Sequence, residues 1–175
     1  GSGVDTFRFS DGVTLTNNGM IDGGVGTDVL EGNLSANVFV ITGVNEGTYD
    51  TVDFTGVESL LGRSGADSFT FDTGSSISGL LDGGTGTDIL TGAADGGDFF
   101  IVTGSPNAGD LFDTDDGATP LNGIGTPRTG GGFVSIEDLR GRGGDDNFRV
   151  DANLDDPAGG IDGDAGTNTL FLTAG

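Results

Sequence analysis

Residues 18–32 read NGMIDGGVGTDVLEG, and residues 78–92 read SGLLDGGTGTDILTG. The same stretch of sequence therefore returns 60 positions later (18 to 78), with its glycines, its Asp and its apolar residues in the same places. A more divergent copy, GGIDGDAGTNTLFL, occupies residues 159–172. Internal repetition at a fixed period indicates a fold built from stacked copies of one small unit.

Other segments repeat in step with this one. VDFTGVESLLGRSGADSFTF (52–71) returns as GGFVSIEDLRGRGGDDNFRV (131–150), and NVFVITG (37–43) returns as DFFIVTG (98–104). The unit is thus about 60 residues long, and its later copy is longer by about 18 residues, inserted between Gly104 and Gly131.

The local pattern within a unit is that of β-strands. Apolar residues alternate with polar ones in short runs that Gly-rich turns separate, which is the period of a strand. The clearest pairs are Phe7/Phe9, Val52/Phe54, Phe69/Phe71 and Phe148/Val150. We therefore expect an all-β fold, a parallel β-solenoid (β-helix) of about eight coils of roughly 20 residues, with one inserted loop. A β-sandwich is the alternative, but it does not explain the return of one residue type about every 20 positions.

A finer period within the unit predicts the register of the coils. Apolar residues recur about every 20 positions, so we expect three coils per unit and a single buried row of stacked side chains. The expected row is Ile21, Val40, Leu60, Leu81, Ile101, Leu139 and Ile161.

Composition narrows the class of protein. The 175 residues carry 28 acidic and 6 basic side chains, for a net charge of −22, with no Cys, His or Trp. This charge repels nucleic acid and anionic membranes and attracts cations. No apolar run approaches 18 residues, so we expect no membrane span in this segment. Without disulfides, an exported protein of bacterial type held together by metal is the favoured reading.

One motif could supply that metal site. The pattern G-x-x-G-x-D occurs at 23–28, 62–67, 83–88 and 141–146, and a fifth copy at 163–168 ends in Asn. Carboxylates stacked one coil apart repel each other by roughly 3 kcal/mol, and a cation with oxygen ligands would remove that repulsion. The competing interpretation is that Gly and Asp only form turns and bind backbone amides.

The motif also carries a family resemblance. GGVGTDVL and GGTGTDIL resemble the calcium-binding nonapeptide of the repeats-in-toxin proteins, and the whole unit is similar to repeats of giant bacterial surface and biofilm adhesins of the filamentous-haemagglutinin type. The resemblance implies Ca²⁺ bound by turn carbonyls and Asp side chains of neighbouring coils. It implies as ligands Asp5, Gly24, Gly26, Asp28, Gly62, Gly65, Asp67, Gly84, Gly86, Asp88, Gly141, Gly144, Asp146 and Asn168. A site at the coil of Asp50, which lacks the motif, is not expected.

We therefore expect residues 1–175 to be a single solenoid segment of a longer repetitive protein, extracellular and adhesive, with residues 105–131 as a loop that leaves the core. Expected partners are calcium, and polysaccharide or neighbouring copies of the protein. An S-layer or extracellular filament subunit is the alternative function. A carbohydrate-active β-helix enzyme is less favoured, because the acids are periodic and no His or Lys is present. An ice-binding solenoid is disfavoured because Thr27, Thr87 and Thr167 lie too far apart to form a rank.

Overall fold

The computed structural model describes residues 1–13, 19–94, 96–103, 107–113, 126–151 and 159–173. The fold is all-β, as predicted: the described residues form two sheets and no helix. The ten-stranded sheet contains β1 (Thr6–Arg8), β3 (Val29–Glu31), β7 (Ser59–Leu61), β9 (Leu81–Asp82), β11 (Asp98–Val102), β12 (Gly109–Asp113), β13 (Thr126–Pro127), β14 (Phe133–Val134), β16 (Asn147–Val150) and β18 (Thr169–Leu172). The eight-stranded sheet contains β2 (Met20–Asp22), β4 (Val38–Gly43), β5 (Glu46–Tyr49), β6 (Val52–Thr55), β8 (Ser68–Phe71), β10 (Ile89–Thr91), β15 (Asp138–Arg140) and β17 (Ile161–Asp162).

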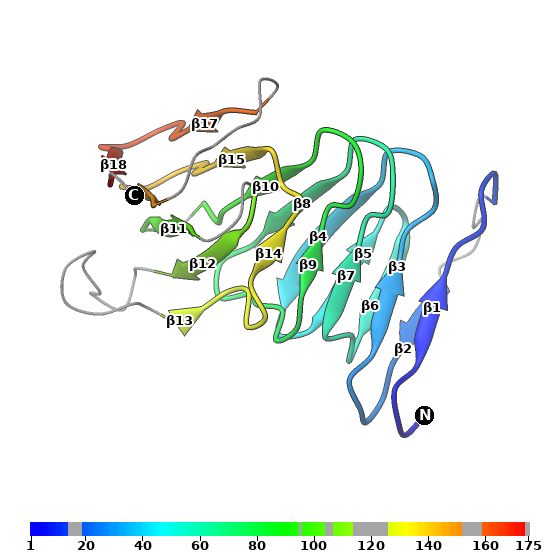
Figure 1. The fold of residues 1–175 in the computed structure, drawn as a ribbon. Helices are drawn as coiled ribbons and strands as arrows, with labels where there is room; N and C mark the ends of the chain where they lie inside the picture. The colour runs from blue at the N-terminus through cyan, green and yellow to red at the C-terminus, as the bar shows by residue number, and fades with distance from the viewer. Residues whose placement is uncertain (14–18, 95, 104–106, 114–125, 152–158, 174–175) are drawn as a thin grey trace.

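The chain alternates between these two sheets as it runs along the molecule (Figure 1). The ten-stranded sheet has the order β1-β3-β7-β9-β14-β12-β11-β16-β18, with β13 added beside β12. The eight-stranded sheet has the order β17-β15-β10-β8-β4-β5-β6-β2. Strands that meet after a passage through the other sheet pair in parallel, as β8 does with β10 and β16 with β18.

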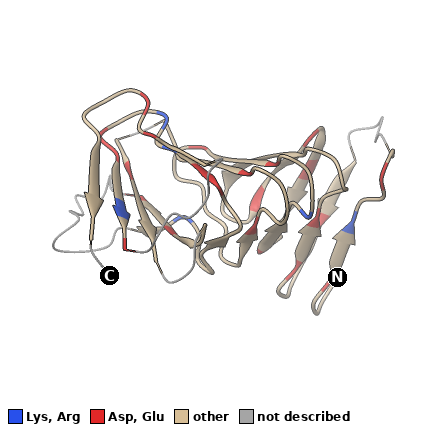
Figure 2. Ribbon diagram, turned by 45° about the horizontal axis from the view of Figure 1, so that its top comes forward, with Lys and Arg blue, Asp and Glu red and all other residues tan. Residues whose placement is uncertain are grey.

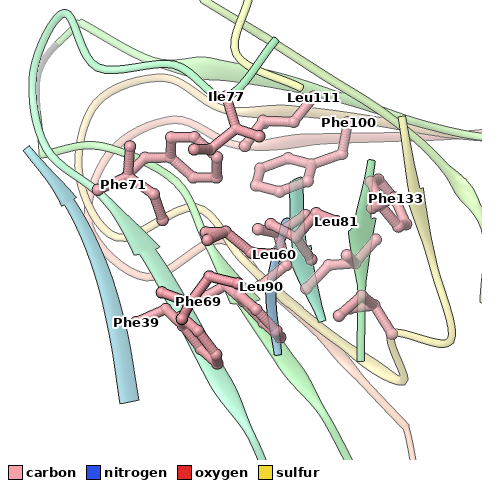
Figure 3. Packing of buried hydrophobic residues seen from close by; sticks show 14 of the residues in the cluster. Phe39, Leu60, Phe69, Phe71, Ile77, Leu81, Leu90, Phe100, Leu111 and Phe133 are labelled. Atoms are coloured by element: carbon pink, nitrogen blue, oxygen red, sulfur yellow. The ribbon is translucent and has the colours of Figure 1, made fainter. Parts of the chain in front are cut away.

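The two sheets bury their facing side chains against each other (Figure 3). Within each strand every second residue points inward, because successive side chains leave a strand on opposite faces. Phe39 stacks on Phe69 with ring centroids 4.8 Å apart, and Phe100 stacks on Phe148 at the same spacing. All four rings are almost completely buried. Corresponding residues of the two units thus make the same contact.

Each unit interrupts the parallel pairing with a three-stranded antiparallel meander. In the first unit β4, β5 and β6 pair antiparallel in that order. In the second unit β11 pairs with β12, and β12 with β14, again antiparallel. Gly47 and Gly109 occupy the same place in the two meanders, opposite Phe54 and Phe133. A Cβ at either glycine would lie within about 2 Å of a strand carbonyl oxygen, so no larger residue fits there.

The meander makes successive units change sheets. From β4 to β11 the chain crosses between the sheets five times, in the order β6 to β7, β8, β9, β10 and β11. Because five is odd, every strand of the second unit lies in the sheet opposite to its counterpart in the first. The counterparts are β4 and β11, β7 and β15, β8 and β16, β9 and β17, and β10 and β18.

This exchange makes the predicted single buried row wrong. Leu60 pairs with Leu81 in one sheet, and Leu139 pairs with Ile161 in the other. Val40 lies in the eight-stranded sheet, so it is separated from Leu60, its neighbour in the expected row. A spacing of about 20 residues predicts one full turn around the core each time. The residues of the meander instead stay within one sheet and complete no such turn.

The predicted inserted loop is also corrected in its extent. Residues 109–113 form β12, which pairs with β11, and Leu111 is fully buried in the core. Thr126 and Pro127 form β13, which adds to the edge of β12. This part of the insertion therefore belongs to the core, contrary to the expectation that residues 105–131 form a loop that leaves it. Residues 105–106 and 114–125 of the predicted loop lie outside the described part of the chain.

Candidate functional site

The G-x-x-G-x-D turns fold each Asp side chain back over the first glycine of its own motif. A Cβ built on Gly62 would lie 2.3 Å from Oδ2 of Asp67, and one on Gly141 would lie 1.9 Å from Oδ2 of Asp146. Gly23 and Gly83 stand in the same relation to their Asp residues. The glycine is therefore required because the carboxylate occupies the space of its side chain.

The inward carboxylates form hydrogen-bonded ladders that join neighbouring turns. Oδ1 of Asp67 accepts the backbone N–H of Asn37 at 2.7 Å, and Oδ1 of Asp88 accepts that of Asp67 at 2.7 Å. Oε2 of Glu137 then accepts the N–H of Asp88 at 2.7 Å. We call these four residues the second ladder. The first ladder is Asp5, Asp28 and Glu58, and the third is Asp98, Asp146 and Asn168, with equivalent bonds.

Glutamate closes the ladder where the next turn lacks the motif, a role that the sequence analysis missed. Glu58 and Glu137 each bind a backbone N–H with Oε2 and accept a side-chain amide with Oε1. That amide belongs to Asn45 in the first unit and Asn107 in the second, and both bonds measure 3.0 Å. The backbone φ angles of these Asn are 57° and 61°, a conformation that Asn tolerates better than most residues. The repeated V-E-x-L and I-E-x-L strings were the available signal.

The second oxygen of each motif Asp has no hydrogen-bond partner. The buried atoms in this state are Oδ2 of Asp28, Asp67, Asp88 and Asp146, and all four side chains are fully buried. Burial raises the pKa of Asp67 and of Asp146 to about 7, and that of Asp88 to about 6, because the charged form loses its hydration. Neighbouring carboxylates of the same ladder raise these pKa values further, while the accepted N–H bonds lower them.

The structure brings together side chains of neighbouring turns that the family resemblance implies as calcium ligands. Asp5 lies beside Asp28, Asp67 beside Asp88, and Asp146 beside Asn168, each joined by a ladder bond. The glycine-containing turns stack as well, through bridges between Ser64 and Thr85 and between Gly143 and Ala165. Asp50 lies apart from the ladders, in the turn between β5 and β6, where its Oδ1 accepts the N–H of Val38.

These turns fit a calcium ion in the kind of donor they offer. The unpartnered Oδ2 atoms are hard, anionic oxygens of the type that Ca²⁺ binds. Within the described ranges, no group of three or more acidic or His side chains gathers as a metal site. An ion at these turns would therefore take most of its six to eight ligands from main-chain carbonyls.

The comparisons with known proteins add no assignment. No protein-family model matches the chain, and no curated protein or solved structure matches it. Among the described residues there is no helix of the length and apolar character needed to span a membrane.

Proposed function

We propose that this chain is a β-solenoid segment of an extracellular structural or adhesive protein of the bacterial surface or biofilm matrix, stabilised by calcium at its carboxylate ladders. The observation that carries the proposal is the repetition of one ladder in both units. Asp5, Asp28 and Glu58 make the same bonds as Asp67, Asp88 and Glu137. Acidic residues that occupy the same position in each unit are expected to stabilise the repeating fold, whereas catalytic acids would be concentrated at one place.

The charge supports an exported, cation-rich setting. A net charge of −22 on 175 residues repels other polyanions and is relieved by divalent cations. Figure 2 shows acidic positions distributed along the whole length of the molecule, with few basic ones among them. When calcium is bound, this acidic surface would contact polysaccharide or neighbouring copies of the protein.

A subunit of an S-layer or extracellular filament shares every one of these features and is the second candidate. A carbohydrate-active enzyme is the less favoured third.

Calcium would be held by Oδ2 of Asp67 and Asp88 together with carbonyls of the turns at 62–65 and 83–86. A bound ion would neutralise the buried carboxylates and link neighbouring turns. The equivalent pair is Asp5 with Asp28. At Asp146 and Asn168 the amide nitrogen takes the place of the second Oδ2, so only Asp146 would offer a carboxylate oxygen there. Because binding to the folded state alone stabilises it by RT ln(1 + [L]/Kd), the melting temperature should rise steadily with calcium.

The test is thermal unfolding in calcium, in magnesium and in chelator at constant ionic strength. We expect a higher melting temperature in calcium, with part of the increase lost in Asp67→Asn, because the pair Asp5 and Asp28 remains. Asp53→Asn, which removes one exposed charge from the outer face of β6, should keep the full response. Equal melting in calcium and chelator would leave the ladders as purely hydrogen-bonded turns and would refute the calcium proposal.

A further inference from the structure

The second unit contains a buried arginine that binds Asp98, the first residue of the third ladder. Arg128 is 1% exposed, and its Nε donates to Oδ1 of Asp98 at 2.7 Å. A second guanidinium nitrogen lies 3.2 Å from Oδ2 of Asp113. The third donates to the carbonyl oxygens of Asp72 and Ser75, at 3.5 and 3.4 Å. The backbone N–H of Arg128 donates to the carbonyl oxygen of Leu111, so hydrogen bonds from both the main chain and the side chain hold the residue in place.

The first unit has the same site without an arginine. Strand register gives the correspondence: Phe39 pairs with Tyr49, as its counterpart Phe100 pairs with Leu111. Two positions further, Thr51 corresponds to Asp113. The turn at 9–13 matches that at 71–75, since Gly12 and Gly74 both have a φ of 73°. The inserted residues that bring Arg128 have no counterpart, because Val52 follows Thr51 directly.

A cavity of about 290 Å³ lies at this place in the first unit. Its lining includes Val13, Tyr49 and Thr51, the counterparts of Ser75, Leu111 and Asp113, three of the residues that bind Arg128. Phe9 also lines it, and its ring stacks on Tyr49 with centroids 4.5 Å apart. The cavity is thus the arginine site of the repeat, left open where the insertion is missing.

The cavity keeps acidic groups, but at new positions. Asp98 and Asp113 are replaced by Asn37 and Thr51, which removes the two carboxylates that contact Arg128. Asp50 replaces Phe112 and lines the cavity, and Asp11 replaces Thr73 beside it, where it accepts the N–H of Leu34. The carboxylate of Asp50 and the rings of Phe9 and Tyr49 therefore line a space that corresponds to the guanidinium site of the second unit. Both features attract an arginine side chain.

We propose that this cavity binds an arginine side chain presented by a polypeptide partner. The neighbouring unit shows that the repeat accommodates a guanidinium at this place, and the carboxylate of Asp50 in the cavity lining has the opposite charge. Ser10 and Val13 are the counterparts of Asp72 and Ser75, and both turns close with the same backbone bond, from Val13 to Ser10 and from Ser75 to Asp72. The proposal does not depend on calcium, so its test is run in chelator.

Tyr49 provides a local reporter, because it is the only tyrosine and the chain has no tryptophan. The experiment is a titration of Tyr49 fluorescence with N-acetyl-arginine amide at fixed ionic strength. N-acetyl-citrulline amide, which has nearly the same shape without the charge, is the matched ligand. We expect a saturable change with the arginine probe and none with the citrulline probe. N-acetyl-lysine amide distinguishes a guanidinium site from a site for any cation.

Two variants locate the binding. Asp50→Asn keeps an acceptor for the N–H of Val38 but removes the charge, and it should weaken binding about two- to fivefold. Val13→Phe fills the cavity and should abolish the saturable change. Asp162→Asn, an exposed change in β17 far along the chain, should leave binding unaltered. Circular dichroism confirms that each variant is folded. Equal responses to arginine and citrulline, no saturation, or an unaltered affinity in Asp50→Asn would each overturn the proposal.

Discussion

Replacing one ladder carboxylate by its amide should stabilise the protein when no metal is present. In Asp67→Asn the side-chain oxygen can still accept the N–H of Asn37, and the amide nitrogen takes the place of the unpartnered Oδ2. The molecule already uses this arrangement at Asn168, whose Oδ1 accepts the N–H of Asp146 while its Nδ2 lies over Gly163. The substitution therefore removes a buried charge and preserves the ladder.

The raised pKa of Asp67 sets the size and the sign of the effect. A rise from 3.8 to about 7 corresponds to at most about 4 kcal/mol against the charged form. Solvent screening and relaxation of the turn reduce this, so we expect about 1–2 kcal/mol. Because the folded protein holds the proton more tightly than the unfolded chain, the penalty is full above pH 7. It decreases as the pH falls toward 4 and is absent below that.

The assay is urea unfolding in chelator at pH 8 and at pH 5. Lower pH should also stabilise the wild-type protein by reducing its general negative charge, so the diagnostic quantity is the difference between wild type and variant. We expect Asp67→Asn to be the more stable protein at pH 8 and to lose most of that advantage at pH 5. Asp53→Asn serves as the exposed control. A variant that is less stable at pH 8, or an advantage independent of pH, would refute the reasoning.

Three further substitutions test the packing of the site. Gly62→Ala should cost roughly 2–4 kcal/mol of unfolding free energy, because the new Cβ would meet Oδ2 of Asp67 and the carbonyl of Gly83. Gly160→Ala should be nearly neutral, because its Cβ would make only an ordinary contact with Oδ1 of Asp138, at 3.5 Å. Arg128→Met should cost about 3–5 kcal/mol by leaving the carboxylate of Asp98 buried without its guanidinium, and adding Asp98→Asn should restore part of the loss, as urea unfolding of both proteins would show. Asn45→Ala should cost about 1–2 kcal/mol by removing the amide that binds Glu58, and an unchanged denaturation midpoint would contradict that role.

The sequence predicts the local structure of the ladders well, because the motif's physics is local. Gly and Asp five positions apart specify a turn in which the carboxylate covers the glycine, and the alternation of Phe69 and Phe71 specifies the strand that follows. Stacking of consecutive motif turns then places Asp67 beside Asp88. Each of these steps uses only spacing within one turn or between neighbouring turns.

The long-range register could not be predicted in the same way. Whether NVFVITG continues a coil or begins a meander depends on Gly47, which lets β5 pack against β4 and β6, and one glycine among 37 gives no such signal in advance. The partner of Glu58 follows from that meander, since Asn45 lies in its first turn. Arg128 was missed because it lies near the end of a Pro- and Gly-rich insertion, a composition typical of exposed loops.

The exchange of sheets leads to a prediction about longer arrays of the repeat. β1 and β16 are copies of the same strand two units apart, and they lie seven strand positions apart in the ten-stranded sheet. β2 and β17, also copies two units apart, lie seven positions apart in the eight-stranded sheet. Two units together therefore restore the starting orientation and advance the molecule by seven strand spacings, about 34 Å. Three complete coils per unit would instead give about 14 Å for every unit, with no exchange. Electron microscopy of a chain with several tandem units should show the longer repeat, with the meanders on alternate sides. Meanders on one side only, at the shorter spacing, would show that the exchange is not a property of the repeat.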